Sequence, residues 1–117
     1  MRAFSSQDRD RIASDFDATV NMDAGELAEW LATSESKAVG WKGAGGTMSE
    51  SVGHASGRRI VEILQTPVAS RTDDDLAHMR KVVGYVRRHL AQRPENIVTS
   101  RWRYSLMNWG HDPLKDF

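Results

Sequence analysis

The chain has 117 residues, of which 39% are hydrophobic and 27% are charged. This length and composition are typical of one globular domain with one core. No apolar run approaches the ~20 residues of a bilayer-spanning helix, and the N-terminus lacks the apolar stretch of a signal peptide. The absence of cysteine excludes disulfides, thiolate metal ligands and cysteine nucleophiles. We therefore expect a cytoplasmic protein with no membrane partner.

The net charge is zero, but the charged residues are unevenly distributed along the chain. Residues 1–57 contain five basic and nine acidic groups, whereas residues 58–117 contain eleven basic and seven acidic groups. Between residues 76 and 110, seven basic residues accompany a single acidic one, Glu95. Such a concentration of positive charge is typical of a surface that binds anions. The alternative is that the acidic and basic halves neutralise each other across the fold.

The first third of the chain predicts two helices. Apolar residues recur every four positions from Ile12 onward and predict a helix over residues 6–20, which Ser5 begins with a capping box. Asp23 repeats the capping signature and begins the second helix. Because the connection is short, we expect an N-terminal helical hairpin over residues 6–33.

A glycine-rich segment separates this hairpin from the C-terminal helices predicted over residues 51–110. Residues 34–48 contain four glycines within seven positions, which is incompatible with a stable helix interior and predicts a loop. A third helix is predicted over residues 51–65. Its Gly53 and Gly57 lie one turn apart on the apolar face, so we expect another backbone to approach closely there.

The fourth predicted helix, over residues 72–92, has the clearest pattern and begins with a capping signature at Thr72. Its apolar residues follow a 3-4-3-4 spacing and make a continuous seam. His78, Tyr85 and His89 form a second stripe on nearly the opposite side, which predicts burial from two sides. A last helix is predicted over residues 99–109, with two tryptophans on one face. The predicted fold class is therefore all-α, a single small domain of about five helices around a central helix 72–92.

No residue pattern indicates catalysis, a metal site or a cofactor. The chain lacks a GxSxG elbow and the HExxH and HxH spacings. His78 and His89 share a helix face but lie about three turns, ~16 Å, apart, which is too far for one metal ion. Most carboxylates cluster at helix starts, where capping explains them. We predict a protein that is not an enzyme and that uses no cofactor.

Residues 53–59, GHASGRR, admit two interpretations. A glycine-rich helix start followed by two arginines could bind a phosphate through backbone N–H groups and guanidinium groups. The segment lacks the GK[ST] ending of a nucleotide-binding loop. The competing interpretation, which we favour, is close helix packing at Gly53 and Gly57 with Arg58 and Arg59 in ion pairs.

The C-terminal half carries the strongest binding signal, because basic side chains can neutralise phosphates. Arg87 and Arg88 also have a structural reason to lie at a helix C-terminus, and Trp102 and Trp109 repeat at a core spacing. The second helix has no basic residue, which argues against a helix-turn-helix motif. The candidate nucleic-acid-binding residues are Arg58, Arg59, Arg80, Lys81, Arg87, Arg88, Arg101 and Arg103.

Our leading hypothesis is a nucleic-acid-binding protein whose partner is DNA or another polyanion. The alternative is a protein–protein interaction module or homodimer, in which the apolar seam and the tryptophans make a homo-oligomer. The two hypotheses differ in salt dependence, because phosphate contacts weaken steeply as salt is added.

Four segments resemble a known family: TSESKAVGWK, ESVGHASGRRIVEIL, DDDLAHMRKVVGYVRRHLAQRP and SRWRYSLMNWGHDPLK. They resemble domain-of-unknown-function family 3140, which is found mainly in bacteria with relatives in fungi. The resemblance covers about residues 12–115. Some family members carry the label DNA-binding protein, and the resemblance implies no catalytic residues. Residues 40–49 lie where such proteins vary in length, in agreement with a loop.

Overall fold

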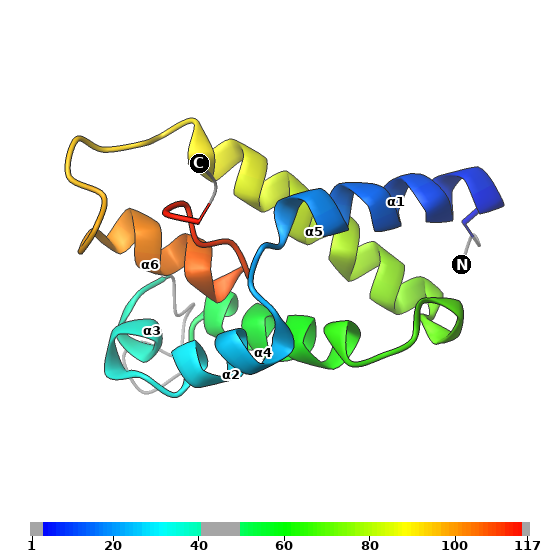
Figure 1. The fold of residues 1–117 in the computed structure, drawn as a ribbon, viewed down its shortest axis with the longest axis horizontal. Helices are drawn as coiled ribbons and strands as arrows, with labels where there is room; N and C mark the ends of the chain where they lie inside the picture. Colours follow the sequence, from blue (N-terminus) through cyan, green and yellow to red (C-terminus); the bar gives the residue numbers. More distant parts are fainter. Residues whose placement is uncertain (1–3, 41–49, 116–117) are drawn as a thin grey trace.

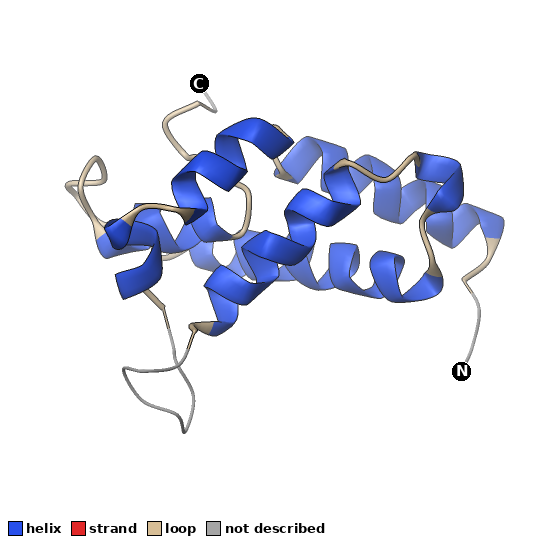
Figure 2. Cartoon of the chain, turned by 90° about the horizontal axis from the view of Figure 1, so that it is seen from below, coloured by secondary structure: helices blue, strands red, loops and turns tan. Residues whose placement is uncertain are grey.

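A computed structural model of the chain describes residues 4–40 and 50–115. Within these residues it contains only helices, which confirms the predicted all-α class (Figure 2). The elements are α1 (Ser6–Thr19), α2 (Ala24–Leu31), α3 (Ser34–Ala38), α4 (Val52–Leu64), the 3-10 helix η2 (Val68–Ser70), α5 (Asp73–Leu90) and α6 (Arg101–Asn108). The predicted central helix is α5, which contacts α1, α4 and α6.

The helix starts lie where the capping signatures predict them. Ser5, Asp23 and Thr72 each accept a hydrogen bond from the backbone N–H three residues later. In all three cases the acidic residue at that third position accepts a hydrogen bond from the capping residue's own N–H, which completes a capping box. At the other end of the chain, Gly110 follows α6 with φ 82°, a left-handed conformation that glycine adopts without strain.

The segment predicted as the loop 34–48 begins with a short helix instead. Thr33 caps α3 by accepting a hydrogen bond from the Ser36 N–H. Ser36 is fully buried, and its hydroxyl donates a hydrogen bond to the Asn108 side chain of α6. This contact joins residues 72 positions apart, so the local glycine content gives no sign of it. Residues 41–48 of the predicted loop lie outside the described residues.

The helices form two layers, with α1 beside α5 in one and α2 beside α4 in the other (Figure 1). The predicted N-terminal hairpin is therefore not present, because α1 and α2 pack on different partners. The connection between them is held by the C-terminal segment. The N–H groups of Asn21 and Met22 both donate to the Gly110 carbonyl, at 3.1 and 3.2 Å. These contacts direct α2 away from α1.

Glycine packing joins α4 to α2 and α6, as the sequence predicts. A Cβ on Gly57 would lie 2.6 Å from the Asn108 carbonyl oxygen and 2.6 Å from a methyl group of Leu31. A Cβ on Gly53 would lie 2.9 Å from the Trp109 indole nitrogen. Both positions therefore require glycine for the observed approach, which confirms the packing interpretation of residues 53–59.

Aromatic rings fill the contact between α5 and α6. Tyr85 stacks on Trp109 with ring centroids 4.2 Å apart, and on His89 at 5.1 Å. His78 and Trp102 extend the stack at its two ends. The stripe of His78, Tyr85 and His89 is thus covered by α6, whereas the apolar seam of α5 faces the core. Burial of α5 from two sides is confirmed.

Candidate functional site

The exposed side of α5 carries four cations. Arg80 and Lys81 precede Gly84 by about one turn, and Arg87 and Arg88 follow it by about one turn. All four side chains are exposed. At 100° per residue these positions share one face of the helix, with the two pairs separated by ~10 Å along the axis. The apolar seam of the same helix fixes this face outward.

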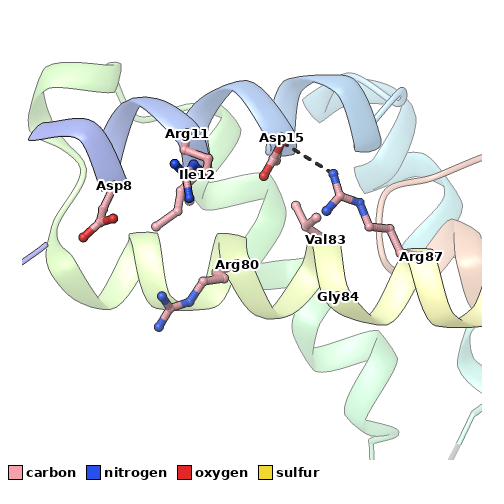
Figure 3. Close-up of a pocket in the computed structure, with 8 residues that line it drawn as sticks. All are labelled: Asp8, Arg11, Ile12, Asp15, Arg80, Val83, Gly84 and Arg87. Carbon is pink, nitrogen blue, oxygen red and sulfur yellow. Dashed lines mark ion pairs between the residues drawn. The ribbon is translucent and has the colours of Figure 1, made fainter. Parts of the chain in front are cut away.

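A groove of about 310 Å³ lies between α1 and α5, beside two of these cations (Figure 3). Ile12 and Val83 provide apolar side chains and Gly84 provides bare backbone. Charged side chains come from both helices, as Figure 3 shows. They are Asp8, Arg11 and Asp15 of α1 and Arg80 and Arg87 of α5.

The cations around this groove are held to different degrees. Arg87 faces Asp15 across the groove with an N–O distance of 3.4 Å. The Arg80 guanidinium lies over the Phe4 ring, 5.0 Å from its centroid. Arg88 lies along its own helix, with Nη1 3.1 Å from the place of a Gly84 Cβ. Lys81 has neither a hydrogen bond nor an ion pair to the part of the chain that the structure describes.

Three of the predicted site residues are engaged in ion pairs elsewhere. Arg58 donates two hydrogen bonds to Glu50, at 2.6 and 2.8 Å. Arg59 contacts Asp75 at 2.7 Å. The candidate Arg103 donates to both carboxylate oxygens of Asp112 and to the Val98 carbonyl.

The eight candidates therefore fall into three groups. Arg80, Lys81, Arg87 and Arg88 gather on one face of α5. Arg58, Arg59 and Arg103 are tied to carboxylates. Arg101 is exposed at the start of α6, on a different helix from the group of four.

Part of the positive charge in residues 58–117 is neutralised by carboxylates in residues 1–57. This is the alternative interpretation of the uneven charge distribution. Arg58 pairs with Glu50, Arg87 with Asp15, and Lys115 with Glu26. The Arg58 hydrogen bonds lower the pKa of Glu50 to about 2, against the opposing effect of burial, and His54 adds a smaller lowering. This neutralisation is strongest away from the exposed face of α5.

The contribution of α1 to the groove was not predicted from the sequence. The alternating charges of this helix, Arg11 and Asp15 among them, predict a solvated face. The available signal was the four-residue spacing of Arg11 and Asp15, which places them on one side of α1. Only the pairing of α1 with α5 shows that this side meets Arg87.

The described residues do not form a recognisable catalytic or metal centre. No three His, Asp or Glu residues in this part of the chain lie close enough to hold a metal ion. Ser56 Oγ lies 2.9 Å from His78 Nε2, and burial, with Arg59 and Lys81, lowers the His78 pKa. Ser56 is only 4% exposed, so its hydroxyl is not presented to a substrate.

A second groove, of about 420 Å³, lies where α4, α5 and α6 meet. Its lining is largely apolar, with Val52, Tyr85 and Trp109 among its residues and Lys81 as its one charged residue. Lys81 thus borders both this groove and the basic face of α5. In addition, no helix in the described ranges is long and apolar enough to cross a membrane.

The fold and this surface define a small all-helical protein with a basic helix face bordering a charged groove. A family model described as "Protein of unknown function (DUF3140)" matches residues 15–107, and the chain belongs to this family. The resemblance noted in the sequence is thereby confirmed. No curated protein and no solved structure matches the chain.

Proposed function

We propose that this protein binds nucleic acid through the exposed face of α5. The observation that carries the proposal is the grouping of Arg80, Lys81, Arg87 and Arg88 on one helix face, where only Arg87 meets a carboxylate of the described residues. Closely spaced, exposed cations neutralise phosphates and release counterions, which drives binding to a polyanion. Arg11 adds a fifth positive charge from α1.

Binding without catalysis fits the rest of the molecule. The one contact between a serine hydroxyl and a histidine ring in the described residues involves a buried hydroxyl, and the groove carboxylate Asp15 faces Arg87. Arginine and lysine contacts to phosphate carry little sequence information. We therefore propose a backbone-binding protein with little base preference.

The alternative, an interaction module or homodimer, depended on the apolar seam of α5 and on the tryptophans. The seam residues lie in the core, and Trp102 and Trp109 are buried against α5. These surfaces are mostly used within the chain, although Trp109 also lines the groove between α4, α5 and α6. The structure thus favours the cationic face as the binding surface.

The test measures binding of the full chain to fluorescently labelled duplex DNA by anisotropy, as a function of salt. The variant Lys81→Gln/Arg88→Gln removes two cations of the face. We expect it to bind about tenfold more weakly at ~50 mM salt, and the slope of log K against log salt to fall by about two.

A matched control removes the same charge elsewhere. The variant Arg58→Gln/Lys115→Gln alters two residues that are already paired with Glu50 and Glu26. We expect its affinity to change much less. The absence of wild-type binding at ~50 mM salt, or equal losses in the two double variants, would overturn the proposal. A dimeric mass by light scattering would favour the alternative.

A further inference from the structure

We infer that Asp15 acts as an internal competitor of phosphate for Arg87, so that nucleic acid must displace this carboxylate to occupy the groove between α1 and α5. The inference rests on the proposed function and deepens it, because it assigns a regulatory role to one acidic residue of the same site. It concerns Asp15 of α1 and Arg87 of α5, which face each other across the groove (Figure 3).

The contact between Asp15 and Arg87 is loose. Its N–O distance of 3.4 Å is the longest among the ion pairs of the described residues, and no hydrogen bond accompanies it. The Arg87 side chain is 63% exposed and the Asp15 side chain 38%. By contrast, Arg58 makes two short hydrogen bonds to Glu50. An exposed pair with this geometry contributes little and opens readily.

A phosphate in the groove can make more favourable contacts with the surrounding cations than Asp15 makes with Arg87. Arg11 and Arg80 line the same groove as Arg87, so an oxyanion placed there is also attracted by their positive charges. Gly84 lacks a side chain, and the Arg88 guanidinium lies over it, with Nη1 3.1 Å from the place of a Gly84 Cβ. Two oxygens of a phosphate can also accept a bidentate pair of hydrogen bonds from the planar guanidinium group of Arg87. Asp15 instead makes one long contact.

The cations beyond the groove favour an extended polyanion over a small ligand. Lys81 and Arg88 continue the positive surface along the adjacent side of α5. A nucleic acid supplies phosphates at regular spacing, so it can occupy the groove and this side together. Asp15 then lowers the affinity for such a partner by the small free energy of its pair with Arg87.

The effect follows from the strength of such pairs. If Asp15 holds Arg87 in the free protein, removing its charge frees Arg87 and raises affinity for DNA. An exposed ion pair of ordinary strength corresponds to a gain of about two- to fivefold. This gain adds to the general effect of removing one negative charge, which any nearby carboxylate would show.

The experiment separates the two effects with a matched carboxylate. Asp17 lies two residues along α1, on its opposite side, and is exposed with no partner among the described residues. Asp15→Asn and Asp17→Asn change the net charge equally. At about 100 mM salt, we expect Asp15→Asn to tighten DNA binding two- to fivefold more than Asp17→Asn does.

A second arm repeats both substitutions in an Arg87→Gln background. Without Arg87 the ion pair with Asp15 cannot form, so we expect the two variants to bind DNA with equal affinity. Equal gains in the wild-type background, or an Asp15→Asn advantage that persists without Arg87, overturn the inference while leaving DNA binding intact. If neither the wild type nor any variant binds DNA, the inference and the proposed function both fail. If polyglutamate displaces the DNA as effectively as unlabelled DNA, the groove does not select phosphate and the inference is wrong.

Discussion

Helix α4 and helix α1 are packed in contrasting ways. Helix α4 meets α6 through Gly57, whose Cα approaches the Asn108 carbonyl so closely that a Cβ would stand 2.6 Å from it. Helix α1 meets α5 through larger residues such as Ile12 and Val83, with long charged side chains along the edge. The first contact brings two backbones together, whereas the second leaves a groove of about 310 Å³.

This difference predicts which of the two contacts determines stability and which determines binding. Where glycine brings backbones together, buried polar groups must be satisfied inside the protein, because water has no access. Where large side chains hold two helices apart, charged groups stay in contact with solvent and can exchange one partner for another. We therefore expect substitutions at the α4–α6 contact to change the free energy of unfolding, and substitutions at the α1–α5 groove to change binding.

The largest effect is expected at Asn108, which is fully buried. Its Oδ1 accepts hydrogen bonds from Trp30 Nε1 at 2.7 Å and Ser36 Oγ at 2.5 Å, and its Nδ2 donates to the Ser36 carbonyl at 3.0 Å. Asn108→Leu leaves these three groups without partners and should lower the free energy of unfolding by about 3 kcal/mol. Urea denaturation measures the loss. Asn96→Leu, in an exposed loop, is the control and should change little.

The next effect is expected at Gly57. Alanine favours a helix interior over glycine by about 1 kcal/mol, so a simple propensity argument predicts stabilisation by Gly57→Ala. The added Cβ would instead collide with the Asn108 carbonyl and Leu31, and we expect a net loss of about 2 kcal/mol. Gly25→Ala in α2 is the matched control, because its Cβ would meet only the Asp23 carboxylate at 3.4 Å. A stabilised Gly57→Ala variant would show that the α4–α6 contact accommodates a side chain, as the α1–α5 contact does.

Local sequence patterns predict much of this fold because capping and apolar periodicity act within one or two turns. The capping boxes at Ser5, Asp23 and Thr72 all form, and Gly53 and Gly57 lie at the predicted close approach. The limits of the predicted helices fall within about two residues of those observed.

Long-range contacts account for the features that the sequence did not predict. Helix α3 depends on the contact of Ser36 with Asn108, and the divergence of α1 from α2 depends on the Gly110 carbonyl. The same distinction applies to the candidate site. The cations of α5 follow from charge pattern and helix geometry, whereas the meeting of Asp15 with Arg87 depends on how α1 pairs with α5.

The smallest effect concerns Glu50, which fixes the start of α4 on the closely packed side. Glu50 contacts Arg58 and His54, and His54 Nε2 lies 2.8 Å from the Leu31 carbonyl oxygen at the end of α2. The pKa of Glu50 is lowered from 4.5 to about 2, chiefly by the Arg58 hydrogen bonds. Because the folded-state pKa is depressed, the stabilisation is complete above pH 4.5 and is lost as the pH falls towards 2.

The variant Glu50→Gln tests this assignment. At pH 7 we expect it to lower the free energy of unfolding by roughly 1 kcal/mol, since the carboxylate is partly exposed and its charge is screened. The difference from the wild type should shrink as the pH falls from about 4.5 to 2, as followed by urea denaturation at each pH. Asp15→Asn is the control from the open groove, and its pair is looser and more exposed. If Asp15→Asn lowers the free energy of unfolding at pH 7 as much as Glu50→Gln does, the groove pair stabilises the fold. The distinction between a stabilising α4 side and a binding α1–α5 groove would then be wrong.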